Sequence, residues 1–287
     1  MINFYLISTN HLKGGMLFED EDDFRAGMNI VPICAYLTKL KVLSFILMSS
    51  HVHFVLQCTG TEAKLFIDKY KMLYSKHYCR KHGAREFLRR LGTDIQEVKI
   101  EDESLFRAIA YVVMNSVAAN LVPNPTLYPW GTGAIVFSSM PSKGIMLGEL
   151  SQRKQYMILK SRVDLPVDFI LGDSGYILPS SYVPVKYVES LFRTPKRYSF
   201  FLNNSSKSKQ RLNNGEAPTF HDTVVRAAMK NLIQSLFRKA SIADMDERQK
   251  VELIRQIQRR FGSDENQLVR ISGLPYEEVD RYLNGFY

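Results

Sequence analysis

The sequence FILMSSHVHFVLQ, at residues 45–57, constrains the architecture more than any other part of the chain. Apolar and β-branched residues flank a Ser-Ser pair, which predicts two strands joined by a tight turn, the second over residues 51–58. Side chains alternate between the two faces of a strand, so His51 and His53 share one face and Phe54 lies on the other. The stretch therefore predicts a hairpin that presents two imidazoles about 7 Å apart.

Two imidazoles on one face of a strand can bind a divalent cation through neutral ring nitrogens. His51 and His53 are equally compatible with a surface pair or with hydrogen-bonded residues of a core. The His-x-His spacing does not separate these readings, so a metal site requires a third ligand from elsewhere in the chain.

A second chemically distinctive segment lies some fifty residues later, at residues 104–121. Its apolar residues follow helical spacing. Arg107, Tyr111 and Asn115 recur every four residues and form one polar stripe on the predicted helix. Taken alone, a tyrosine in such a stripe is typical of the edge of a core, with its hydroxyl in water.

The two segments together, LMSSHVHFVLQ at residues 47–57 and AYVVMNSVAANLVPNPTLYPW at residues 110–130, resemble the single-tyrosine HUH transposases of small bacterial insertion sequences. The resemblance is closest to the REP-associated tyrosine transposases and covers about residues 1–135. In that family a His-hydrophobe-His pair lies on a central strand, a nucleophilic tyrosine lies on a helix, and an amide four positions later completes a metal site. Four residues match those positions one by one: His51, His53, Tyr111 and Asn115.

The resemblance implies a DNA transposase that acts as a single-strand endonuclease and strand transferase. Tyr111 would form a 5′-phosphotyrosine, and Mg²⁺ or Mn²⁺ would bind to His51, His53 and Asn115. The implied partner is single-stranded DNA with a hairpin. The family includes dimers and monomers, so a homodimer remains open. Arg107 could lower the pKa of Tyr111 or hold a phosphate, or it could be an ordinary surface residue.

The order of predicted elements indicates an α+β fold. Strands are predicted at 2–9, 41–48, 51–58 and 95–100, with helices at 21–37, 62–80 and 104–121. This β-α-β-β-α-β-α order is that of the ferredoxin-like (split βαβ) plan, an antiparallel sheet with helices packed on it. The acidic run at residues 19–23 is expected to begin the first helix rather than to bind a metal.

A basic, tyrosine-rich segment occupies residues 69–90. We predict that eight cations in it contact DNA, namely Lys69, Lys71, Lys76, Arg80, Lys81, Arg85, Arg89 and Arg90. Tyr70, Tyr74 and Tyr78 follow at intervals of four. They are compatible with a core stripe on a helix or with stacking platforms for single-stranded bases.

Composition agrees with a soluble DNA-binding protein. The chain has 287 residues, enough for two domains, and a net charge of +9, which favours a polyanionic partner. Its three cysteines have no zinc-ligand spacing and favour a reducing compartment. No apolar run of about eighteen residues is present, so we expect a cytoplasmic protein that does not enter a membrane.

Beyond the catalytic domain at 1–135, the sequence predicts three further parts. Residues 136–202 form an accessory region of unknown role, residues 203–215 a polar linker, and residues 216–287 a mainly helical region. The last part contains two short helices around Gly273 and Pro275, a helix-turn-helix-like pattern. Generic helical hairpins have the same pattern, and acidic residues in the second helix disfavour contact with phosphates.

Two other functions fit the same residues. The first is a domesticated relative that binds repeat or promoter DNA without catalysis. The second is a metal-dependent phosphodiesterase that uses the histidine pair without a covalent step. A trapped protein–DNA adduct would distinguish the transposase from both.

Overall fold

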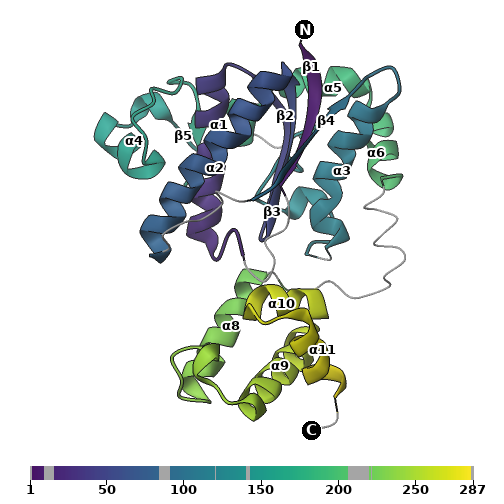
Figure 1. Ribbon diagram of the computed structural model, residues 1–287. Helices are drawn as coiled ribbons and strands as arrows, with labels where there is room; N and C mark the ends of the chain where they lie inside the picture. The colour runs from purple at the N-terminus through teal and green to yellow at the C-terminus, as the bar shows by residue number, and fades with distance from the viewer. Residues whose placement is uncertain are drawn as a thin grey trace.

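The computed structural model describes residues 2–9, 16–83, 91–119, 121–139, 143–205, 220 and 222–285. An antiparallel sheet of four strands forms the centre of the amino-terminal part, and a bundle of helices forms the carboxy-terminal part (Figure 1). The fold class is therefore α+β, as the order of predicted elements indicated.

The sheet has the strand order β2-β3-β1-β4, which is that of the ferredoxin-like plan. Its strands are β1 (Asn3–Thr9), β2 (Lys41–Met48), β3 (His51–Cys58) and β4 (Thr93–Val98). All neighbouring pairs are antiparallel, with Met48 opposite His51 next to the β2–β3 turn. The hairpin thus lies where alternation placed it, and β3 is a central strand.

Three helices cover this sheet: α1 (Glu21–Thr38), α2 (Gly60–His82) and α3 (Ser104–Ala118). Helices α1 and α2 lie on one face and α3 lies on the other (Figure 1). Because both faces are covered, seven of the eight residues of β3 are buried, and the strand reads as an almost continuous apolar run.

Local signals set the ends of these helices. The Asp20 side chain accepts a hydrogen bond from the Asp23 amide at the start of α1, as expected of the acidic run. Thr59 and Glu62 form a capping box at the start of α2, and Gly83 ends that helix with a φ of 68°.

A buried carboxylate ties α1 to α2. Asp23 accepts hydrogen bonds from His77, Lys81 and His82 of α2 and from the Glu19 amide. Burial alone would raise the pKa of Asp23, but these donors lower it below its ordinary value. The acidic run is therefore structural: it caps α1 and fixes α2 against it.

The open edge of β2 is covered by residues 130–132. The Leu47 amide donates to the Trp130 carbonyl at 2.8 Å, and the Thr132 amide donates to the Phe45 carbonyl at 3.0 Å. A Cβ at Gly131 would lie 2.6 Å from the Phe45 carbonyl oxygen, so the close approach requires glycine. The 3₁₀ turn η1 (Pro125–Leu127) precedes this segment.

The accessory region, residues 136–202, packs against the sheet domain, by which we mean the four-stranded sheet with helices α1, α2 and α3. Its elements are β5 (Ile145–Met146), η2 (Leu147–Glu149), α4 (Gln152–Leu159), β6 (Ile170–Leu171), η3 (Pro179–Ser181), α5 (Val185–Phe192) and α6 (Pro195–Asn203). Val188, Phe192, Tyr198 and Phe201 belong to the same apolar core as the sheet. The predicted linker begins at the end of α6, and its residues 206–215 lie outside the described part of the chain.

We call the carboxy-terminal helices, residues 222–285, the helical module. They are α8 (Asp222–Ser235), η4 (Ile242–Asp244), α9 (Glu247–Phe261), α10 (Glu265–Ser272) and α11 (Tyr276–Asn284). The module has its own apolar core, which Met16 also joins. Among the described residues, no helix combines the length and apolar character needed to cross a membrane.

Candidate active site

Strand β3 places His51 and His53 on the face of the sheet covered by α3. Phe54 points to the opposite face, where it contacts Phe66 and Tyr70 of α2. The two imidazoles are almost fully buried, 7% and 4% exposed, and their ring centroids lie 4.7 Å apart. The pair is thus an internal feature of the domain and not a surface pair.

Two serine hydroxyls hold these rings. Ser8 Oγ lies 2.8 Å from Nδ1 of His53, and Ser50 Oγ lies 3.1 Å from Nδ1 of His51. Ser8 is directly opposite His53 in the register of β1 and β3, so their side chains share one face. Because the serines engage Nδ1, Nε2 is the nitrogen that each ring would use toward a cation.

Helix α3 brings a tyrosine to this pair. The ring of Tyr111 meets that of His53 edge to face, with 5.3 Å between centroids and planes at 80°. Leu105, Ile109 and Val112 are buried and fix the helix on the sheet. Tyr111 is half-buried, and its ring packs against His53.

Asn115 follows Tyr111 by one helical turn and is 3% exposed. Its Nδ2 donates to the carbonyl of Tyr111 at 2.8 Å and to that of Val112 at 3.4 Å. These bonds fix the carboxamide with its nitrogen on the helix backbone. Oδ1 is consequently the Asn115 atom that a cation would bind.

The pKa of Tyr111 reflects its burial, and Arg107 does not counteract that effect. Burial raises the pKa of Tyr111 above its ordinary value. Arg107 instead donates to the Asp102 carbonyl at 2.9 Å and pairs with Glu103 at 3.2 Å, and its side chain is largely exposed. Arg107 therefore does not lower the pKa of Tyr111, contrary to one of the two functional roles considered for it.

The donor set suits a divalent cation only if the amide takes part. Within the described ranges, no group of three or more His, Cys, Asp or Glu side chains is placed to hold a metal ion. Two imidazoles and one carboxamide oxygen are acceptable ligands for Mn²⁺ and Mg²⁺, which complete their shells with water or phosphate oxygens. By the chemistry of their donor atoms, the residues present fit such an ion.

The tyrosines of α2 are core residues, so the stacking-platform interpretation is wrong. Tyr70, Tyr74 and Tyr78 are 1%, 0% and 8% exposed. Tyr74 donates to the Leu17 carbonyl at 2.5 Å, and Tyr78 donates to Glu19. Their spacing of four residues reflects the side of the helix that faces the sheet.

The basic residues of α2 do not line the histidine site, because α2 covers the opposite face of the sheet (Figure 1). Lys71 donates to the Leu91 carbonyl at 2.5 Å, and Lys81 pairs with Asp23 at 3.0 Å. Lys69 is partly buried, whereas Lys76 and Arg80 are exposed. The remaining predicted DNA contacts, Arg85, Arg89 and Arg90, lie outside the described residues.

Two conservative substitutions test the core assignment of α2. We expect Tyr74→Phe to lower the free energy of unfolding by about 1–2 kcal/mol, because it leaves the buried Leu17 carbonyl without its donor. Tyr70→Phe is the matched control: among the described residues the buried Tyr70 hydroxyl has no hydrogen-bond partner, so its removal should be neutral or stabilising. Urea denaturation measures both. Equal destabilisation by the two variants would contradict the assignment.

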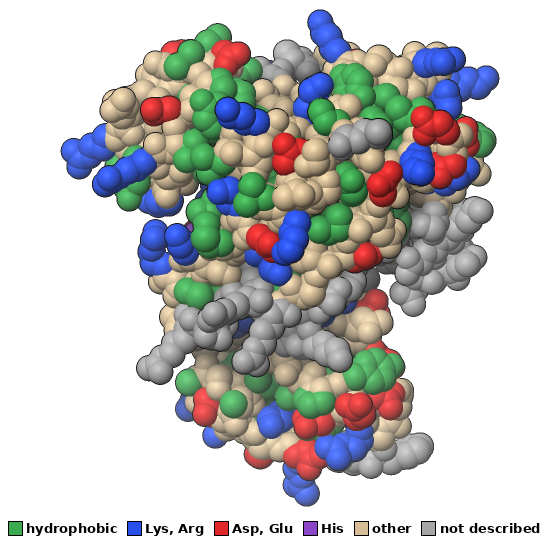
Figure 2. Space-filling model, turned by 45° about the horizontal axis from the view of Figure 1, so that its top comes forward, with side chains coloured by type: hydrophobic (Ala, Val, Ile, Leu, Met, Phe, Trp, Pro, Cys, Tyr) green, Lys and Arg blue, Asp and Glu red, His purple; other side chains and the backbone are tan. Residues whose placement is uncertain are grey.

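In the helical module, α10 and α11 are two short helices joined through Gly273, Leu274 and Pro275, and their assignment as a helix-turn-helix stays a prediction. Arg270 of α10 is engaged by Asp222, and Arg281 of α11 pairs with Glu247. The first turn of α11 is acidic. Figure 2 shows acidic and basic side chains interspersed over this module on the face that it draws. DNA binding by α10 and α11 stays a prediction.

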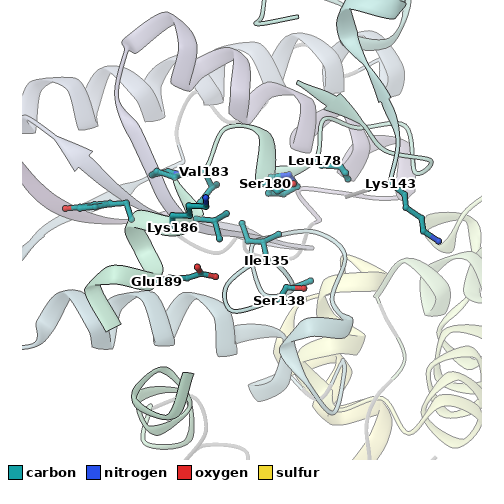
Figure 3. A pocket seen from close by; sticks show the side chains of 13 residues that line it. Ile135, Ser138, Lys143, Leu178, Ser180, Val183, Lys186 and Glu189 are labelled. Carbon is teal, nitrogen blue, oxygen red and sulfur yellow. The ribbon is translucent and has the colours of Figure 1, made fainter. Parts of the chain in front are cut away.

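A pocket of about 900 Å³ lies elsewhere in the protein and is not lined by the candidate-site residues. It is formed between the segment that follows Trp130 and the segment that leads into α5 (Figure 3). Ile135, Val183 and Pro184 supply apolar lining, and Lys186 and Tyr187 add polar groups. None of the histidine, tyrosine or asparagine residues of the candidate site contributes to it.

Comparison with known proteins gives a weak structural similarity. No model of a known protein family matches the sequence, and no curated protein matches it. A solved structure of a REP-associated tyrosine transposase bound to a REP hairpin is similar with a TM-score of 0.33 and 8% identity. That match covers 45% of this chain and 76% of the transposase chain. A similarity this weak does not establish an activity.

The histidines, the tyrosine and the asparagine stay predicted site residues, and sequence reasoning did not predict the contacts that Ser8 and Ser50 make with the imidazoles. Ser50 is adjacent to His51, and a side chain that touches a candidate ligand is a signal that could have been used. Ser8 is 45 residues away from His53 in the sequence, and only the strand register brings the two together.

Proposed function

We propose that this chain is a metal-dependent transposase that cleaves and rejoins single-stranded DNA through a covalent bond to Tyr111. The observation that carries the proposal is the packing of the Tyr111 ring against His53, which in turn contacts His51 in a buried pair. A nucleophile, two imidazoles and an amide share one face of the sheet although α3 and β3 are some fifty residues apart.

The proposed step is a transesterification. The phenolic oxygen of Tyr111 attacks the phosphorus of a phosphodiester and loses its proton to water. The bond from phosphorus to the 3′ oxygen breaks, and that oxygen takes up a proton to give a free 3′-hydroxyl. The 5′-phosphotyrosine conserves the phosphodiester bond, so the reverse attack by a 3′-hydroxyl rejoins DNA without a nucleotide cofactor.

The surroundings of Tyr111 explain why this step needs assistance. A phenol whose pKa is raised by burial is protonated at neutral pH and is a poor nucleophile. Bound Mn²⁺ or Mg²⁺ supplies a Lewis acid for a phosphate oxygen. His51, His53 and Asn115 would hold it, while Ser8 and Ser50 keep the imidazoles oriented.

The proposed substrate is single-stranded DNA that carries a hairpin. Two features support it: the motif resemblance carried by residues 47–57 and 110–130, and the net charge of +9. Exposed Lys76 and Arg80 are available to DNA but lie on the helix that covers the other face of the sheet. The strand that enters the site must therefore meet other side chains first.

Covalent trapping tests the proposal. Purified protein is incubated with Mn²⁺ and a pool of labelled single-stranded hairpins from the DNA that flanks the gene, and products are separated on a denaturing gel. We expect a shifted protein–DNA band that carries a phosphodiester at Tyr111 by mass spectrometry. Binding without an adduct or cleavage would favour the non-catalytic DNA-binding protein, and cleavage without an adduct would favour the phosphodiesterase.

A further inference from the structure

The helical module docks at the end of the sheet where β3 and its histidine pair begin. Met16, which precedes α1, inserts into the apolar core of the module. Glu19 pairs with Arg226 of α8 at 3.0 Å. Residues 16–19 and the β2–β3 turn thus contact the module.

Asp222, at the start of α8, lies at the centre of this contact and is 3% exposed. Its carboxylate forms an ion pair with Arg270 at 2.9 Å and accepts a hydrogen bond from Gln267 at 2.8 Å. Both residues are on α10. The carboxylate also accepts a hydrogen bond of 2.5 Å from the hydroxyl of Ser49. One buried carboxylate therefore joins α8 and α10 of the module to the turn of the hairpin.

Burial alone would raise the pKa of Asp222, but the charge of Arg270 and the hydrogen bonds from Arg270, Ser49 and Gln267 lower it. The buried Asp222 carboxylate therefore depends on these hydrogen-bond donors to stay charged. A displacement of α10 that carried Arg270 away would leave a buried charge behind, so the arrangement favours movement of these groups together.

The turn that Asp222 holds leads directly into the histidine pair. The Ser49 carbonyl accepts hydrogen bonds from the amides of Leu17 and Phe18 at 2.6 and 3.1 Å. The next residue, Ser50, contacts Nδ1 of His51. The conformation of the turn therefore sets both the start of β3 and the orientation of the first imidazole.

We propose that Asp222 is a positioning residue that couples the placement of the helical module to the geometry of His51. The effect on cation binding rests on the proposed function, whereas the effect on the turn does not. Docking of α10 on Asp222 holds Ser49, and the next residue in the turn, Ser50, contacts the ring of His51. Events that move α10, such as binding of DNA to the module, would alter the histidine site without contact to it.

The experiment compares the full-length wild-type chain with Asp222→Asn, Ser49→Ala and the matched control Arg226→Gln. The control removes the side-chain pair of Arg226 with Glu19 and leaves the backbone hydrogen bonds from Leu17 and Phe18 to the Ser49 carbonyl in place. Hydrogen exchange of the peptide covering residues 47–56 reports the turn and the start of β3, and titration with Mn²⁺ alone reports the site. Ser49→Ala leaves the Asp222–Arg270 pair intact, so it remains informative if Asp222→Asn disturbs the fold of the module.

We expect exchange in residues 47–56 to become at least about threefold faster in Asp222→Asn and Ser49→Ala but not in Arg226→Gln. The affinity for Mn²⁺ should fall by about tenfold in the same two variants. Unchanged exchange in Ser49→Ala, or an equal change in Arg226→Gln, would overturn the coupling. Accelerated exchange without any Mn²⁺ binding, even by the wild type, would support the coupling and contradict the proposed function instead.

Discussion

Replacing Tyr111 by phenylalanine will abolish formation of the covalent DNA adduct while the protein stays folded and still binds DNA. The substitution removes the oxygen that we propose attacks phosphorus and keeps the ring that packs on His53 with 5.3 Å between ring centroids. We expect the rate of adduct formation to fall by at least about 10³-fold, as for loss of a nucleophile. A denaturing gel measures the adduct, and fluorescence anisotropy measures binding.

The control for this variant is Tyr36→Phe. Tyr36 is an exposed tyrosine of α1, which covers the other face of the sheet. The Tyr36→Phe variant should therefore form the adduct at the wild-type rate. An adduct in Tyr111→Phe would mean that another residue is the nucleophile. Because burial raises the pKa of Tyr111, the wild-type rate should also increase with pH through the neutral and mildly alkaline range.

The hairpin was predictable because its signal is local. Residues 41–48 and 51–58 form strands as their composition indicated, since a turn between two β-branched runs leaves few alternatives. Alternation then fixed the shared face of His51 and His53. Helical spacing likewise placed Tyr111 and Asn115 on one side of α3.

The basic, tyrosine-rich segment shows where local pattern fails. Tyr70 and Tyr74 at helical spacing suit a core and a stacking surface equally, because sequence does not say which side of a helix meets the sheet. The side of the sheet is also a tertiary property: α2 and α3 cover opposite faces, so the cations of α2 are separated from Tyr111. Ser8 and Asp222 were missed for the same reason, since each acts on a segment distant in the sequence.

Replacing His53 by alanine should remove Mn²⁺ binding and adduct formation together. His53 is the imidazole nearest to Tyr111, and its loss leaves one ring and one amide, too few ligands to hold a divalent cation firmly. We expect the affinity for Mn²⁺ to fall by at least about 100-fold. Calorimetric titration of Mn²⁺ in the absence of DNA measures this without reliance on catalysis.

Ser8→Ala provides the graded comparison for His53→Ala. It keeps both imidazoles and removes only the hydroxyl that holds Nδ1 of His53 at 2.8 Å, so Mn²⁺ affinity should fall by about tenfold. The loss of Mn²⁺ affinity should be larger in His53→Ala than in Ser8→Ala, because a metal ligand contributes a bond to the cation, whereas its serine partner only orients the ligand. Wild-type Mn²⁺ affinity in His53→Ala would place the cation elsewhere, and the histidine pair would then be a hydrogen-bonded feature of the core next to Tyr111.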